Sequence, residues 1–211
     1  MDPEGTLERV RGHTMRVGIS LNDPWTREEG GAFGGVEVEL IDGFGAEMDA
    51  EVEYFEGSEE ELFAALLHHE LDVVIGGITS QNSHAAEAGM THPYFTTALV
   101  VGWPEDEEVP TDIAGQEVAA ERGTEALGLL RKTDAVVVEV DRIEEAPGAA
   151  AVDDFLLDDL SLRDTGIRLS ETDHVMAVAT GENDFMTELE RFLLVRHDEI
   201  ETLLDRDAAG A

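Results

Sequence analysis

Residues 71–95 read LDVVIGGITSQNSHAAEAGMTHPYF. The stretch opens as a buried strand at Leu71–Ile75, passes through two glycines into a polar loop, and closes on Pro93-Tyr94-Phe95. In open α/β sheets, ligands bind beyond the carboxyl ends of the strands. The stretch therefore predicts a central strand that presents hydroxyl and amide groups to a ligand.

The chain before this stretch alternates between short strands and amphipathic helices. They are expected at 15–19, 36–48, 51–55 and 58–68. The last helix begins with a capping box, in which Ser58 caps the first turn and Glu61 reaches back. This alternation predicts a parallel α/β sheet with right-handed crossovers.

The chain after residue 95 repeats the alternation. Extended segments or strands are expected at 97–103, 116–120, 135–140, 149–152, 166–170 and 174–179, with a helix at 123–130. One long amphipathic helix over 185–204 is expected to close the chain, because apolar residues recur there at helical spacing.

The composition limits the class of protein. The 211 residues are 42% apolar, which suits one large domain or two small lobes. No apolar run approaches the ~20 residues of a membrane span, and the N-terminus as given shows no secretory signal, so the compartment stays open. The chain contains no cysteine, which excludes disulfides, thiolate metal sites and a cysteine nucleophile.

Charge is the most unusual property of the sequence. There are 49 acidic residues against 13 lysines and arginines, a formal net charge of −36. A nucleic-acid partner is not expected, because phosphate contacts need basic patches. The acids could form a disordered tail or bind cations, or they could adapt a whole surface to high salt. They are spread along the chain, which favours a surface for strong salt, where the Debye length falls to ~3 Å.

Six stretches, in order, resemble family 3 of the extracellular solute-binding proteins, the binding components of polar amino-acid ABC transporters. They are RVGISLNDPW (16–25), GGVEVELIDGFGAEMDAEVEYF (34–55), the stretch 71–95, VAAERGTEALGLL (118–130), AVDDFLL (151–157) and DHVMAVATGENDFMTELERFL (173–193).

The resemblance implies an α/β, two-lobed, periplasmic-binding-protein-like (type II) fold, each lobe a mostly parallel sheet flanked by helices. Lobe one would comprise 14–95 plus 176–205, and lobe two would be the inserted segment 98–172. Residues 1–13 and 206–211 would be flexible termini. The two lobes would close on a ligand.

The resemblance also assigns ligand contacts in lobe one. Trp25 would cover the ligand, although it could equally be a half-buried core residue. Gly77 and Thr79 would bond the ligand through backbone and hydroxyl, or simply form a strand-end turn. His84 departs from the family, which uses arginine here to clamp a carboxylate; histidine lacks the bidentate fork and could be an ordinary loop residue.

In lobe two, the resemblance points to a helix start and an acid. Gly123 and Thr124 would offer backbone N–H groups to an anion, and Thr124 could also act as a simple N-cap. Asp153 matches the family's acidic residue that takes the ligand's amino group, although chance matches are frequent in so acidic a chain.

The expected function is to trap a small polar, amino-acid-like solute between two lobes, as a monomer serving an ABC permease. No cofactor and no metal are expected. Two alternatives stay open. One is an enzyme resembling cyclohexadienyl dehydratase, with Glu59, His84 or Asp153 as acid or base. The other is a ligand-sensing regulatory domain.

Overall fold

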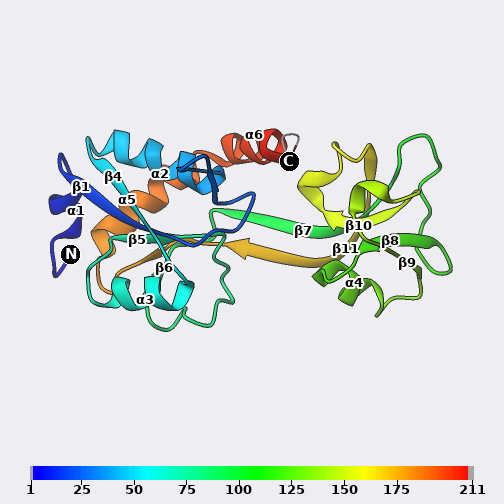
Figure 1. Ribbon diagram of the computed structural model, residues 1–211, viewed down its shortest axis with the longest axis horizontal. Coiled ribbons are helices and arrows are strands. Elements are labelled where there is room, and N and C mark those ends of the chain that lie inside the picture. The colour runs from blue at the N-terminus through cyan, green and yellow to red at the C-terminus, as the bar shows by residue number, and fades with distance from the viewer. Residues whose placement is uncertain (1, 209–211) are drawn as a thin grey trace. The chain divides into compact units, whose positions relative to one another are not determined.

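The computed structural model describes residues 2–208, which form two compact units (Figure 1). The first unit combines 2–95 with Asp173–Asp207, and the second contains Thr96–Thr172. Strands β7 (Phe95–Pro104) and β11 (Leu162–His174) carry the chain out of the first unit and back into it. Among the described residues, no helix combines the length and apolar character that a membrane span requires.

The first unit is a five-stranded sheet with helices on both faces. Its further elements are α1 (Thr6–Val10), β1 (Thr14–Ile19), β2 (Arg27–Glu29), β3 (Ala32–Gly34), α2 (Val36–Glu47), β4 (Glu51–Glu56), α3 (Glu59–Leu67), β5 (Val73–Ile75), β6 (Gly89–Met90), β12 (Ala177–Val178), α5 (Asn183–Leu194) and α6 (His197–Ala208). The sheet order is β4-β1-β5-β12-β6, with β4, β1 and β5 parallel and β12 antiparallel to β5.

Packing in the first unit follows the apolar spacing of the sequence. Helix α3 packs on one face of the sheet through Leu62, Phe63 and Leu66. Helices α2 and α5 meet on the other face, where the Phe44 ring lies 5.8 Å from Phe185 and 5.3 Å from Phe192 (Figure 1). The capping box at Ser58 and Glu61 is present, which confirms the predicted start of α3.

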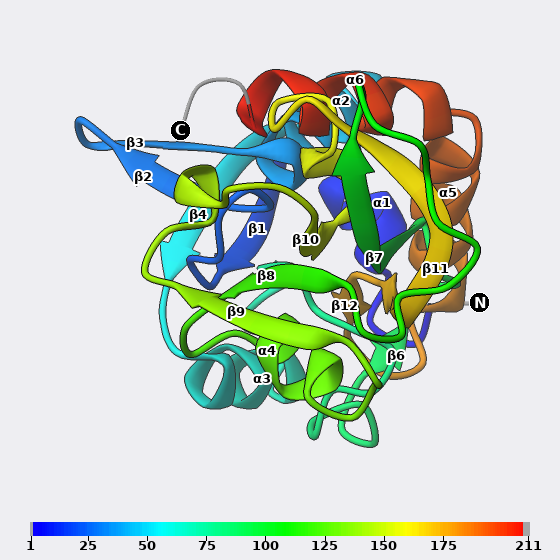
Figure 2. The same ribbon diagram turned by 90° about the vertical axis from the view of Figure 1, so that its right-hand side faces the viewer.

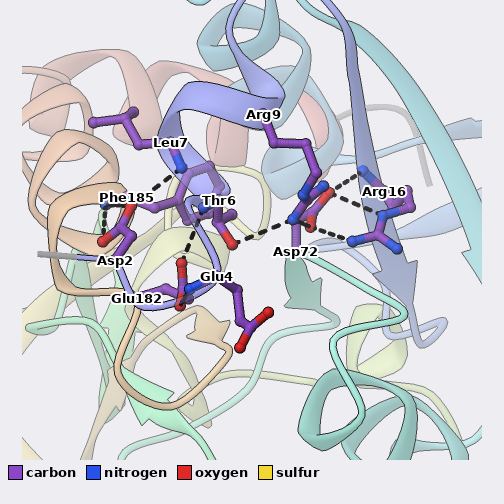
Figure 3. A network of polar contacts seen from close by, with 9 residues as sticks. All are labelled: Asp2, Glu4, Thr6, Leu7, Arg9, Arg16, Asp72, Glu182 and Phe185. Atoms are coloured by element: carbon purple, nitrogen blue, oxygen red, sulfur yellow. Dashed lines mark hydrogen bonds and ion pairs between the residues drawn. The ribbon is translucent and has the colours of Figure 1, made fainter.

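The sequence predicts a flexible terminus at 1–13, of which the structure describes residues 2–13. They contain α1, which is fastened by acids from distant parts of the chain (Figure 3). Glu182 accepts the backbone N–H groups of Glu4 and Thr6, each at 3.0 Å. Burial acts to raise the pKa of Glu182, but these hydrogen bonds outweigh it and lower the pKa. Tertiary contacts thus hold a helix too short to be stable alone.

The same segment is joined to the sheet by a second carboxylate. Asp72 lies at the start of β5 with its side chain inaccessible, and it accepts hydrogen bonds from Arg9 at 2.6 Å and Arg16 at 2.7 Å (Figure 3). Burial acts to raise the pKa of Asp72, but the two guanidinium groups outweigh it and lower the pKa. A buried carboxylate shared by two cations therefore fixes the N-terminal segment against β5.

The C-terminal region also differs from the prediction of one long helix. It forms α5 and α6, separated at Val195 and Arg196, and Leu194 and Val195 are 80% and 76% exposed. The sequence also predicts a flexible tail at 206–211, and the described part of this tail, as far as Ala208, is the end of α6. Residues 209–211 lie outside the described residues.

The second unit is a five-stranded sheet of order β11-β7-β10-β8-β9. Its further elements are β8 (Glu117–Glu121), α4 (Glu125–Leu130), β9 (Val136–Val140), the 3-10 turns η1 (Ile143–Glu145) and η2 (Asp154–Leu156), and β10 (Ala150–Asp153). Strand β8 is parallel to β9 and β10, and β7 is antiparallel to β10.

Two apolar layers cover the two faces of this sheet. Helix α4 packs on one face through Ala126, Leu127 and Leu130, and Figure 2 shows it under the paired strands β8 and β9. Leu157 and Leu162 pack on the other face. The carboxyl ends of the parallel strands β8 and β10 thus meet at one edge of the sheet, next to the start of α4.

Candidate functional site

The loop that follows β5 is held in a conformation that favours glycine. Gly76 and Gly77 have φ angles of 150° and 65°. A Cβ atom at Gly77 would lie 2.5 Å from Asn22 and 2.5 Å from Trp25, so a side chain there would collide with both residues. Close packing of the backbone against the Trp25 loop therefore needs glycine at this position.

A buried carboxylate, Glu37, occupies the donors of this loop. Its Oε2 accepts the N–H groups of Gly76 at 2.7 Å and Gly77 at 2.8 Å, and the Tyr94 hydroxyl donates to Oε1 at 2.6 Å. The residue is fully buried, and burial raises its pKa despite these three hydrogen bonds. No sequence motif marks Glu37 as a site residue, although Ile41 and Phe44 follow it at helical spacing on the same buried face of α2.

Trp25 is buried within the first unit. It is 5% exposed, and its ring centroid lies 3.9 Å from that of His174 and 6.2 Å from that of Tyr94. Burial lowers the pKa of His174 to about 4, so this histidine is neutral at ordinary pH. The aromatic cluster fixes Trp25 against the Gly77 loop.

Thr79 and His84 lie on the polar loop after β5. Thr79 is partly exposed and forms an isolated β-bridge with His174. The His84 ring stacks on Phe63, with centroids 5.1 Å apart, and its Nδ1 lies 3.5 Å from a carboxylate oxygen of Glu87. Any positive charge on His84 is therefore already opposite an acid.

Glu59, an acid considered for catalysis, has a partner on the same loop. Its Oε2 accepts a hydrogen bond from the Asn82 amide at 2.8 Å, and the Asn82 side chain in turn accepts the His84 N–H at 2.8 Å. Glu59 thus ties α3 to the polar loop.

The second unit contains a cavity of about 220 Å³ at the carboxyl ends of β8 and β10. It is lined by Leu99, Glu121, Thr124, Glu125, Ala126, Ile143, Ala151, Val152, Asp153, Leu156 and Thr172. Two predicted site residues, Thr124 and Asp153, therefore share one pocket. Gly123 is not in the lining; it forms the turn before α4 with a φ of 83°.

Thr124 acts as the N-cap of α4. Its hydroxyl accepts the Leu127 N–H at 3.4 Å and donates to the Glu121 carbonyl at 2.8 Å. Glu121 in turn accepts the Ile143 N–H at 3.1 Å. Thr124 and Glu121 are thus bonded to neighbouring groups of the pocket wall.

The carboxylate of Asp153 differs from that of Glu121 in the same wall. Within residues 2–208, no hydrogen bond or ion pair reaches the Asp153 carboxylate. Burial raises its pKa to about 6, and the negative charges of Asp154 and Glu125 add to the shift. A desolvated carboxylate without a donor is unfavourable, and a bound cation or donor would relieve it.

All charged side chains that line the pocket are acidic. Glu121, Glu125 and Asp153 contribute carboxylates, and no lysine or arginine lines the cavity. Over the described part of the chain, no group of three or more histidine, aspartate or glutamate residues is arranged to hold a metal ion. The geometry suits an uncharged or cationic organic group.

Comparison with protein families identifies the chain. The model of the bacterial extracellular solute-binding proteins, family 3, matches residues 15–204. The chain belongs to this family. The fold is accordingly the two-lobed type II periplasmic binding protein fold expected from the sequence, and it supports a solute-binding role. A comparison with curated proteins gives no match.

Solved structures share the fold of this family 3 protein at low identity. The unliganded, open L-cystine solute receptor of Neisseria gonorrhoeae superposes with a TM-score of 0.73 and 18% identity, over 90% of this chain and 89% of the receptor. The second substrate-binding domain assigned to an amino-acid ABC transporter of Streptococcus pneumoniae Canada MDR_19A gives 0.72 and 17%, over 93% and 100%.

A third structure links the fold to an enzyme. The ancestral amino acid-binding protein AncCDT-1, a precursor of cyclohexadienyl dehydratase, gives a TM-score of 0.55 and 17% identity, over 96% of this chain and 97% of AncCDT-1. At these identities, the three likenesses concern the fold alone.

Proposed function

We propose that this family 3 protein binds a small polar, amino-acid-like solute, and that the pocket around Asp153 holds the solute's amino group. The observation that carries the proposal is the carboxylate of Asp153, which is desolvated and has no partner in the described chain. The cavity of about 220 Å³ lies a little below the ~300–1,000 Å³ of drug-sized ligand pockets and suits a small solute.

A thermal-shift screen of amino acids, amines and small organic acids in molar potassium chloride tests the proposal. A ligand at a hundredfold excess over its Kd should stabilise the fold by about 2.7 kcal/mol. The variant Asp153→Asn should lose most of this shift. Asp159→Asn, an exposed acid outside the pocket, is the matched control and should keep it. A screen without any hit, or an Asp153→Asn variant that responds like the wild type, would contradict the proposal.

Delivery of the solute to an ABC permease is part of the proposal. Its support is the family itself and the likeness to a domain assigned to an ABC transporter. Stimulation of a permease–ATPase pair encoded beside the gene, reconstituted in vesicles, is the test. ATP hydrolysis that does not respond to the loaded protein would leave a sensing role as the better explanation.

One observation favours an enzyme as the second candidate. With its pKa raised to about 6, Asp153 is close to the range in which a carboxyl group serves as general acid or base. AncCDT-1, with the same fold, is a precursor of a dehydratase. Incubation with a cyclohexadienyl substrate, followed by detection of the aromatic product, separates catalysis from binding.

A further inference from the structure

The groups that could bind a charged ligand at the two candidate surfaces divide into an acid without a partner, Asp153, and donors that are already bonded, namely the guanidinium groups of the second unit and the N–H groups of Gly76 and Gly77. In the second unit, the acceptor is Asp153, flanked in the same pocket by Glu121 and Glu125. An ammonium or guanidinium group placed there would supply the donors that the described chain does not. A carboxylate placed there would meet three like charges and no lining cation.

The cations of the second unit that are nearest in sequence to the pocket residues are bonded to acids. Arg122, which follows β8, forms an ion pair with Asp141 and approaches Glu139 at 3.5 Å. Arg142, which precedes Ile143, lies 3.3 Å from Glu144, and Arg168 lies 4.0 Å from both Asp154 and Glu171.

The single lysine of the chain, Lys132, is not in the lining of the pocket. It follows the carboxyl end of α4, whereas the amino end of that helix lines the cavity. The described part of this unit therefore directs no uncommitted guanidinium or ammonium group into the pocket.

The first unit shows the same pattern on its own candidate surface. The N–H groups of Gly76 and Gly77, which could bind a carboxylate, both donate to Glu37. His84, at the position of the family's arginine, stacks on Phe63 and faces Glu87. Glu37 thus holds the two backbone donors of this loop that could otherwise bind an anion, and Glu87 lies close to His84.

From this division we infer that the solute is an organic cation without a carboxylate group, either an amine or a guanidine. The inference rests on the proposed solute-binding function and departs from an α-amino acid as the ligand. An α-amino acid would place its carboxylate beside an acidic wall, whereas the corresponding decarboxylated amine would bring only its donors. Specificity of this kind depends on repulsion of the wrong ligand as much as on attraction of the right one.

Calorimetric titration of the complete chain with matched ligands tests the inference. Arginine, argininamide and agmatine form one series, because the amide removes the carboxylate charge with little change of shape. Lysine with cadaverine, and glycine betaine with choline, are further pairs. Titrations use the lowest potassium chloride concentration at which the circular dichroism is native, so that charge effects are screened least.

In the series that binds, the ligand without a carboxylate should bind at least tenfold more tightly, equal to about 1.4 kcal/mol. Argininamide should resemble agmatine rather than arginine. Tighter binding of the amino acid, or argininamide that binds no better than arginine, would overturn the inference and leave the solute-binding proposal standing. No binding in any series, with native circular dichroism, would overturn both.

Two variants test whether this pocket determines the preference for a ligand without a carboxylate. Asp153→Asn should weaken agmatine at least tenfold, while the control Asp159→Asn should bind like the wild type. Glu125→Gln should narrow the preference for agmatine over arginine, because it removes one of the repelling charges. An unchanged preference in Glu125→Gln, together with unchanged agmatine affinity in Asp153→Asn, would show that this pocket does not select the solute.

Discussion

Replacement of Asp153 by asparagine should stabilise the empty protein, although it weakens ligand binding. The pKa of Asp153 is raised from 3.8 to about 6, first by burial and then by Asp154 and Glu125. Ionisation is therefore less favourable in the folded chain than in the unfolded chain. Asparagine keeps the shape of the side chain and removes the charge, so the variant avoids this penalty.

The magnitude follows from the size of the shift. A displacement of about two pKa units corresponds to about 3 kcal/mol at neutral pH, at 1.36 kcal/mol per unit. Molar salt screens the repulsion from Asp154 and Glu125, which leaves a gain of about 1–2 kcal/mol. For a chain of this length, a gain of that size should raise the unfolding temperature by several degrees.

The difference in stability between Asp153→Asn and the wild type should depend on pH. Below the unfolded pKa of 3.8, both states are protonated and the penalty is absent; it grows between about pH 4 and 6 and is constant above. Urea unfolding of the wild type, Asp153→Asn and the control Asp159→Asn, at pH 4, 5, 6 and 7.5, measures the difference directly. An Asp153→Asn variant that is less stable than the wild type at pH 7.5, or equally stable at every pH, would contradict this prediction.

Four further predictions concern the proposed ligand, Glu37, His84 and the net charge of the chain. Agmatine affinity should rise with pH through about 6, and agmatine binding near that pH should release a proton, because the ionised Asp153 is the partner. Calorimetry in buffers of different ionisation enthalpy detects the proton, and Asp153→Asn should show neither effect. Glu37→Gln should lower the free energy of unfolding by about 1–3 kcal/mol, measured by urea unfolding against the exposed control Glu60→Gln. Glutamine has one acceptor oxygen where Glu37 uses two, so either the two buried N–H groups or the Tyr94 hydroxyl loses its acceptor. His84→Ala should leave agmatine affinity within about twofold by calorimetry, because His84 already faces Glu87; a larger loss would place His84 in the site. The protein should loosen at low ionic strength, seen by circular dichroism over a potassium chloride series, because a formal net charge of −36 is then unscreened; full stability in dilute buffer would contradict this.

The sequence predicts those parts of the fold that depend on local signals. The capping box at Ser58, the apolar spacing of α2 and α3, and the valine-rich run before Gly76 define their elements within a few residues. The family resemblance then orders these elements into a type II fold. Thr124 as an N-cap was also a local signal, and the structure confirms it.

Features that depend on distant contacts could not be predicted in this way. Helix α1 has five residues, and its fastening comes from Glu182 and Asp72, which lie far along the chain. No proline or glycine marks the break between α5 and α6; the only sign is that Arg196 and His197 interrupt the apolar spacing. The site has the same difficulty, because 49 acidic residues look alike in sequence.

The structure separates these acids by their partners. Asp72 accepts hydrogen bonds from two guanidinium groups, and Glu182 accepts them from two backbone N–H groups; in both, the hydrogen bonds outweigh burial and lower the pKa. Glu37 is fully buried, so its pKa is raised, yet three donors hold it in place. These three carboxylates are structural, because the fold supplies each of them with hydrogen-bond donors.

Asp153 differs from these three because the described chain supplies it with no donor. Selection for stability alone would favour an asparagine or an apolar residue at this position, since an unpaired, desolvated carboxylate weakens the empty protein. The charge is explained if a solute brings the missing donors. The penalty that the unpaired carboxylate imposes on the stability of the empty protein is then relieved when the solute binds. The same argument accounts for the lining of the pocket, where Glu121 and Glu125 would strengthen the attraction for a cation and oppose any ligand that carries a carboxylate.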